Sequence, residues 1–234
     1  MDLNRYSVIN SKNKREIVLL RGSGCKWKKC RFCDYHLDFS NDASQNYALN
    51  KTVLKNVSGI YKTLEIINSG SFIDLDKKTI SLIKDICVRK NIHSLHFECH
   101  WIHRDKINDL KEYFRNDNID VKIKSGIETF DYNFREKYLI KGIPDVSPSE
   151  IAKYFDEICL LFGLKGQTLE TMEKDIQIGL KYFERICVNI MTENGTPVKP
   201  DKSVIKTFKE NLYKKYSEYE NIDILIKNTD YGIG

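Results

Sequence analysis

The sequence contains no apolar run long enough to span a membrane, only four prolines in 234 residues, and no low-complexity segment or short-period repeat. Its apolar runs have the length of strands, whereas a membrane-spanning helix needs about 20 apolar residues. The first residues, Met1-Asp2-Leu3-Asn4-Arg5, lack the charged and then apolar pattern of a secretory leader. These absences favour a globular protein with no membrane partner, which we expect to be cytoplasmic.

Neither sign of charge dominates. The 38 Lys and Arg residues face 33 Asp and Glu residues, which gives a net charge of +5 without a basic tail. Nucleic acid is therefore not an expected partner. The seven cysteines are an odd number, and without a leader a disulfide framework is improbable. Closely spaced cysteines in such a protein more often bind a metal or carry out redox chemistry, and three of these lie within nine residues.

Six short apolar runs alternate with stretches of helical periodicity along the chain. The runs are residues 16–21, 64–68, 94–99, 121–127, 157–162 and 185–191, and the helical stretches are 76–90, 105–114, 168–183 and 201–216. Alternating strands and helices predict βαβ units and a parallel sheet. Six units are too few for an eight-stranded barrel of about 250 residues. We therefore predict the α/β class, as a partial (β/α)6 TIM-like barrel with parallel strands.

We expect residues 1–234 to form a single domain. Its core would cover about residues 16–200, and a C-terminal extension, 201–234, would add an edge strand at 222–226. Thr168 and Thr171 are expected to cap the helix that follows them.

Cys25, Cys30 and Cys33 directly follow the first predicted strand, after Arg21-Gly22-Ser23-Gly24. Their spacing lets three thiolates converge on one metal centre. Zinc would need a fourth ligand, for which His36 is a candidate, so a zinc-binding module using these three cysteines and His36 is one alternative. The position at a strand's carboxyl end, where α/β folds place active sites, favours a catalytic centre. A 4Fe–4S cluster on three cysteines leaves one iron open to a ligand.

This pattern resembles the radical S-adenosylmethionine (SAM) superfamily, whose signature is three clustered cysteines after the first strand. The usual gaps are three and two residues, whereas here they are four and two, and Phe32 matches the aromatic residue before the last cysteine. The resemblance implies a 4Fe–4S cluster on Cys25, Cys30 and Cys33, with SAM chelating the open iron through its amino and carboxylate groups. An electron from the cluster then generates a deoxyadenosyl radical.

Three later segments resemble SAM-binding motifs of the same superfamily. They are Asn68-Ser69-Gly70-Ser71, then Gly126-Ile127-Glu128-Thr129 with Arg135 downstream, and Phe162-Gly163-Leu164-Lys165-Gly166-Gln167-Thr168. By this resemblance the first turn holds the methionine ammonium, Glu128 contacts the ribose or the ammonium, and Arg135 pairs with the carboxylate. The implied SAM-binding residues are Phe32, Ser69, Gly70, Ser71, Glu128, Arg135 and Gly163.

Polar side chains alternate with apolar ones along 95–101, which places His96, Glu98 and His100 on one face of the predicted strand. Because helices cover the outside of a barrel, we expect the polar face to line the lumen. On the sixth predicted strand, Asn189 and Glu193 are expected to share a face. The substrate-binding or catalytic candidates are His96, Glu98, His100, Lys124, Asn189 and Glu193. Two alternatives remain for the first three: a second metal site of the two-His-one-carboxylate kind, or ordinary hydrogen-bonded residues at a strand end.

Within the superfamily the compact chain and polar lumen are most similar to the queuine lyases of queuosine salvage. That resemblance implies a lyase reaction that converts queuine, a deazaguanine base, to 7-aminomethyl-7-deazaguanine. The alternative within the same chemistry is a radical enzyme acting on another small amine or on tRNA. Lys26, Lys28, Lys29 and Arg31 surround the cysteines and would dock an acidic electron donor such as flavodoxin or ferredoxin.

Overall fold

The computed structural model describes residues 3–234. They form two compact units. The first unit holds residues up to 28, 35–123 and 231–234, and the second holds 29–34 and 124–230. No helix in residues 3–234 has both the length and the apolar character needed to cross a membrane. The single-domain organisation stays a prediction.

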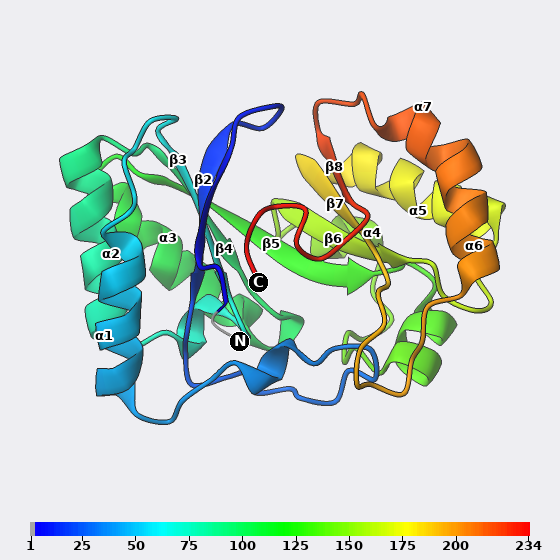
Figure 1. Ribbon diagram of the computed structural model, residues 1–234, viewed down its shortest axis with the longest axis horizontal. Coiled ribbons are helices and arrows are strands. Elements are labelled where there is room, and N and C mark those ends of the chain that lie inside the picture. Colours follow the sequence, from blue (N-terminus) through cyan, green and yellow to red (C-terminus); the bar gives the residue numbers. More distant parts are fainter. Residues whose placement is uncertain (1–2) are drawn as a thin grey trace. The chain divides into compact units, whose positions relative to one another are not determined.

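The first unit is built on a sheet in which a short antiparallel strand precedes three parallel ones. The strands are β1 (Tyr6–Ile9), β2 (Arg15–Leu20), β3 (Thr63–Asn68) and β4 (Ser94–Glu98), in that order. The helices are α1 (Ala43–Leu54), α2 (Lys77–Lys90) and α3 (Ile107–Arg115), with 3-10 turns η1 (Tyr35–Leu37), η2 (Phe72–Asp74) and η3 (Trp101–Lys106). Figure 1 shows the three α-helices together on one side of these strands.

The apolar face of β4 packs beneath the helices, as its alternation predicts. Leu95 and Phe97 are fully buried. The Phe97 ring lies 6.3 Å from that of Phe72 and 5.8 Å from that of Phe114 on α3, measured between centroids. The opposite face of β4, with His96 and Glu98, is therefore turned away from this core.

The second unit repeats the alternation of strands and helices. Strand β5 (Asp120–Glu128) begins in the first unit and continues in the second, where it is followed by β6 (Glu157–Phe162), β7 (Arg185–Ile190) and β8 (Ile222–Leu225), all parallel. The helices are α4 (Pro148–Ile151), α5 (Leu169–Tyr182), α6 (Lys202–Thr207) and α7 (Lys214–Tyr216), with π-helical turns η4 (Phe134–Leu139) and η5 (Phe208–Tyr213). Thr168 and Thr171 form the expected capping box of α5.

The six predicted strands correspond to β2–β7, and the predicted C-terminal edge strand is confirmed as β8, which pairs with β7. Strand β1 and helices α1 and α4 were not predicted. Parallel strands buried on both faces are continuous apolar runs, which makes them visible in the sequence. In contrast, β1 is a short, half-exposed edge strand, and α1 buries Asn46 and Asn50 among its few buried positions.

Candidate active site

The three clustered cysteines lie in the segment after β2 that we call the cysteine loop, residues 25–33. All three thiols are partly exposed and form no disulfide. Cys25 belongs to the first unit, whereas Cys30 and Cys33 belong to the second. Across the part of the chain that the structure describes, no three His, Cys, Asp or Glu side chains are gathered tightly enough to hold a metal ion. Three accessible thiols within nine residues are nevertheless the donor set of a three-cysteine 4Fe–4S cluster, and metal binding itself draws such ligands together.

In the first unit, the predicted glycine turn after β3 lies directly against the start of the cysteine loop. A Cβ atom at Gly70 would lie 3.1 Å from both the Cα and the backbone nitrogen of Cys25, so only glycine allows this approach. Asp74 ties the two segments together. Its side-chain Oδ2 accepts the Ser71 N–H at 2.8 Å, and its carbonyl accepts the Ser23 N–H at 2.8 Å.

Two buried oxygens beside this turn have no hydrogen-bond donor. They are Oδ1 of Asp74 and Oδ1 of Asn68, and both residues are 4% exposed. Burial raises the pKa of Asp74, although the Ser71 hydrogen bond and the charges of His103, Lys26 and Lys28 act the other way. A buried acceptor without a donor costs about 1–3 kcal/mol. The pair therefore fits a ligand that brings N–H donors, such as the ammonium group of SAM. Asp74 is not among the site residues predicted from the sequence.

His100 joins this turn to the cysteine loop. Its backbone N–H donates to Ser71 Oγ at 2.9 Å, and its ring stacks on Trp27 with 5.7 Å between centroids. Because β4 ends at Glu98, His100 caps η3 instead of continuing the strand, and its Nδ1 accepts the Ile102 N–H at 3.3 Å. The first unit thus brings Cys25, the glycine turn and His100 together.

His96 and Glu98 lie on β4 itself. His96 is buried, and its Nε2 lies 3.0 Å from the hydroxyl of Ser94, while Glu98 is half-buried. In register, His96 lies opposite Glu65 of β3, whose carboxylate pairs with Arg15. The polar face predicted for this strand therefore continues across the sheet as a buried ion pair.

In the second unit, Glu128 and Lys141 form a buried ion pair. The register of β5 with β6 shifts between Gly126 and Glu128, and Glu128 takes a left-handed φ of 69°. Its Oε1 accepts from Lys141 Nζ at 2.8 Å. Burial opposes protonation of Lys141, but the charges of Glu128, Cys30 and Cys33 outweigh it and raise the pKa of this ammonium above its ordinary value. Lys141 is not among the site residues predicted from the sequence.

The C-terminal half of the cysteine loop is anchored within the second unit. The Arg31 N–H donates to the Leu139 carbonyl at 3.0 Å, and Asn194 Nδ2 donates to the Phe32 carbonyl at 2.9 Å. The Phe32 side chain packs against an apolar cluster formed by Leu139, Leu161, Leu164, Met191 and Val198. Phe32 therefore acts as an anchor for the loop.

Arg135 is buried, and its guanidinium forms hydrogen bonds within the second unit. Its guanidinium donates to the carbonyls of Thr129, Ile143 and Pro144 at 3.4, 3.3 and 3.1 Å, and its Nε donates to Glu136 at 3.0 Å. These bonds give Arg135 a scaffolding role around the segment after β5. Its assignment to the SAM carboxylate stays a prediction.

Gly163 has a left-handed φ of 88°, and a Cβ atom there would lie 2.6 Å from the Ile205 side chain. Its carbonyl accepts the Asp201 N–H at 2.7 Å. The glycine is thus required by the packing of α6 against the turn after β6. Contact with SAM stays a prediction for this residue.

The remaining substrate candidates differ in their surroundings. Lys124 is buried and lies in register with Glu157, which pairs with Arg185 at 2.7 Å. Asn189 is half-buried on β7. Glu193 is exposed and pairs with Lys199 at 2.6 Å. The expectation that Glu193 continues the strand face of Asn189 is wrong, because β7 ends at Ile190.

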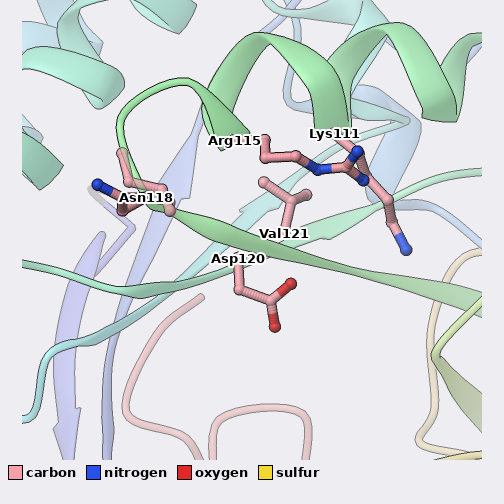
Figure 2. Close-up of a pocket in the computed structure, with 6 residues that line it drawn as sticks. Lys111, Arg115, Asn118, Asp120 and Val121 are labelled. Atoms are coloured by element: carbon pink, nitrogen blue, oxygen red, sulfur yellow. The ribbon is translucent and has the colours of Figure 1, made fainter.

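A separate surface pocket lies in the first unit where α3 leads into β5. Figure 2 shows Lys111 and Arg115 extending from α3 beside the strand that carries Asp120 and Val121. None of the predicted site residues lines it, so the pocket forms no part of the candidate active site.

Comparison with known proteins gives a full-length match to a solved structure. No family model matches the chain. The solved queuine lyase from Clostridium spiroforme, bound to SAM and queuine, is 42% identical, and the match covers 100% of both chains with a TM-score of 0.95. The uncharacterized protein MJ0550 of Methanocaldococcus jannaschii is 29% identical over 173 residues, and the match covers 65% of this chain but 45% of that protein. This chain therefore spans less than half the length of that curated relative.

The queuine lyase match, full-length at 42% identity, confirms the predicted fold class, the partial TIM-like barrel of radical SAM enzymes. It also favours the radical SAM enzyme over the zinc-binding module, because the matched protein is a queuine lyase with SAM bound. The chain belongs to the queuine lyase family of radical SAM enzymes.

Proposed function

We propose that this protein is a radical SAM lyase that cleaves queuine to 7-aminomethyl-7-deazaguanine. The observation that carries the proposal is the likeness to a queuine lyase over the whole chain, at 42% identity with a TM-score of 0.95. The three thiols of the cysteine loop, none of which forms a disulfide, support it, because they supply the ligands that a radical SAM cluster uses.

In this proposal Cys25, Cys30 and Cys33 hold a 4Fe–4S cluster. When bound, the cluster and SAM supply the deoxyadenosyl radical that removes a hydrogen atom from the substrate. The protein's own task is to orient SAM and to keep its charged groups paired. The oxygens of Asn68 and Asp74 beside the Ser69–Ser71 turn are placed to accept from the SAM ammonium, because both are buried and lack a donor.

Glu128 is the second proposed cofactor contact. Its carboxylate is held at the end of β5 by Lys141, and its remaining acceptor capacity suits the ribose hydroxyls of SAM. Phe32 and Gly163 would act through the shape of the loops that surround SAM. Arg135 would support the same segment from within the core.

The substrate would be recognised by polar side chains on the inner faces of the strands. Queuine carries an amine and a guanine-like edge with several donors and acceptors. In the first unit, Glu98 would accept from such donors, and His96 and His100 are each oriented by a hydrogen bond. In the second, Lys124 and Asn189 lie on the strands themselves, whereas Glu193 has the weakest support because it is exposed.

An acidic one-electron donor such as flavodoxin or ferredoxin would complete the system in the cytoplasm. Lys26 and Lys28 are exposed in the first unit, and so are Tyr35, Leu37 and Phe39, which follow in the chain. A basic rim around exposed apolar side chains suits a transient partner of opposite charge.

The test is product analysis after anaerobic reconstitution with iron and sulfide. The reduced protein is incubated with SAM, with and without free queuine, and the mixture is analysed by mass spectrometry. We expect 7-aminomethyl-7-deazaguanine and deoxyadenosine to form together, and deoxyadenosine to fall to a background level without queuine. Deoxyadenosine at background level in both samples would reject queuine as the substrate, and parallel samples with tRNA or another small amine would reveal the alternatives.

A further inference from the structure

Lys141 is buried, unlike the lysines of the cysteine loop itself. Lys26, Lys28 and Lys29 are exposed, whereas Lys141 is 9% exposed. Salt and water screen the interaction between exposed charges that are more than about 10 Å apart. The interactions of a buried charge are screened far less. A buried ammonium can therefore act on a neighbouring metal centre in a way that the surface lysines cannot.

The backbone around Lys141 is fixed to the cysteine loop. Leu139 accepts the Arg31 N–H at 3.0 Å, which places the end of η4 beside the residue that follows Cys30. The Lys141 N–H donates to the Arg135 carbonyl at 3.3 Å, and the preceding Ile140 adopts a left-handed φ of 56°. This turn fixes the direction in which the Lys141 side chain leaves the backbone.

The side chain is fixed as well. Its Nζ lies 2.8 Å from Glu128 Oε1 and 5.6 Å from the centre of the Phe32 ring, and Phe32 directly precedes Cys33. A Cβ atom at Gly126 would lie 2.8 Å from this Nζ, so the absence of a side chain at Gly126 makes room for the ammonium. All of these groups belong to the second unit, as do Cys30 and Cys33.

We propose that Lys141 tunes the reduction potential of the cluster that Cys30 and Cys33 help to hold. Its buried positive charge raises this potential, and Glu128 partly offsets that charge. The inference rests on the proposed function, since it requires the 4Fe–4S cluster. Reduction adds one negative charge to the cluster, and a nearby cation stabilises that charge. Hydrogen bonds, charge and burial around a cluster are the means by which proteins set its potential.

The test is a potentiometric titration of the reconstituted cluster, followed by electron paramagnetic resonance in the absence of SAM. Lys141→Met should lower the midpoint potential, because the cation is lost. Glu128→Gln should raise it, because the offsetting anion is lost. The double variant should fall between the two single variants. A role in folding alone would not move the potential in opposite directions.

Two further variants keep the test decisive. Lys141→Arg retains the charge and should hold the potential near that of the unmodified protein. Lys153→Met removes an exposed lysine of the same unit that pairs with Glu150, and it should cause no shift. If Lys141→Met does not assemble a cluster, Glu128→Gln decides the question. An unchanged or lower potential in Glu128→Gln, or an unchanged or higher potential in Lys141→Met, would overturn the inference. Failure of the unmodified protein to assemble any cluster would instead reject the proposed function.

Discussion

The two ends of the cysteine loop lie in contrasting electrostatic surroundings. Beside Cys25, in the first unit, the buried ionisable group is Asp74, which keeps one oxygen without a donor. Beside Cys30 and Cys33, in the second unit, the buried groups are Glu128 and Lys141, which satisfy each other. The Asp74 oxygen needs a ligand that donates a hydrogen bond, whereas Glu128 and Lys141 are paired within the protein itself.

The two ends of the cysteine loop therefore suit different tasks. An unsatisfied buried acceptor lowers stability until a ligand supplies the donor, so it favours binding. A satisfied buried ion pair instead supplies a fixed local field before any ligand arrives. The first unit is therefore suited to capture SAM, and the second is suited to hold the charge balance around the cluster.

Replacing a cysteine at either end should have the largest effect. Cys25→Ala and Cys30→Ala should each abolish cluster assembly and SAM cleavage, because a three-cysteine cluster has no spare ligand. Iron and sulfide content after anaerobic reconstitution checks this. Cys87→Ala is the matched control, since Cys87 is buried in α2 and should leave the iron content unchanged. A full cluster in Cys25→Ala would show that the first unit contributes no ligand.

Arg135→Ala should cause the next largest effect, on stability. Its guanidinium donates to three carbonyls and to Glu136 from a buried position, so the loss leaves several groups unpaired. We expect the free energy of unfolding, measured by urea denaturation without cofactors, to fall by about 3–5 kcal/mol. An unchanged unfolding curve with weaker SAM binding would instead place Arg135 in the cofactor site.

Asp175 offers a buried carboxylate of the second unit for comparison with Asp74. Its Oδ1 accepts the Phe130 N–H at 2.9 Å, yet burial raises its pKa to about 6, above the ordinary value of 3.8. A pKa that is higher in the folded state makes the folded protein more stable below about pH 4, and this gain is lost as the pH rises through about 6.

The matched variant is Asp175→Asn, which does not ionise. Relative to Asp175→Asn, the unmodified protein should lose about 2.4 kcal/mol of unfolding free energy between pH 4 and pH 7, most of the full shift at 1.36 kcal/mol per pKa unit. Urea denaturation at both pH values measures the difference. Parallel pH profiles for the two proteins would contradict the raised pKa.

Asp74→Asn should have the smallest effect of the set. The amide keeps an acceptor for the Ser71 N–H but loses the negative charge, so SAM binding to the reconstituted protein should weaken roughly tenfold, or about 1.4 kcal/mol. Isothermal titration calorimetry measures the change. Asp76→Asn is the control, because asparagine also caps a helix start and Asp76 caps α2. Equal affinities for the two variants would remove Asp74 from the SAM site.

Much of the fold was predictable from the sequence, because buried parallel strands are apolar runs with little ambiguity. The cysteine loop was equally visible, since its ligands are close together in the chain. Asp74 and Lys141 could not be found in this way. Asp74 is buried beside Gly70, and Lys141 is buried beside Gly126, because neither glycine has a side chain to fill the space. The spacing of residues in a sequence does not show such close contacts. Glu193 was misplaced because periodicity does not show where a strand ends.

The central claim is that three cysteines hold a 4Fe–4S cluster with one iron open to SAM. The most direct measurement is the electron paramagnetic resonance spectrum of the reduced, anaerobically reconstituted protein with and without SAM, together with its iron and zinc content. We predict about four irons per chain, no bound zinc, and a spectrum that changes when SAM is added. A colourless protein that holds one zinc, or a cluster whose spectrum SAM leaves unchanged, would contradict the claim.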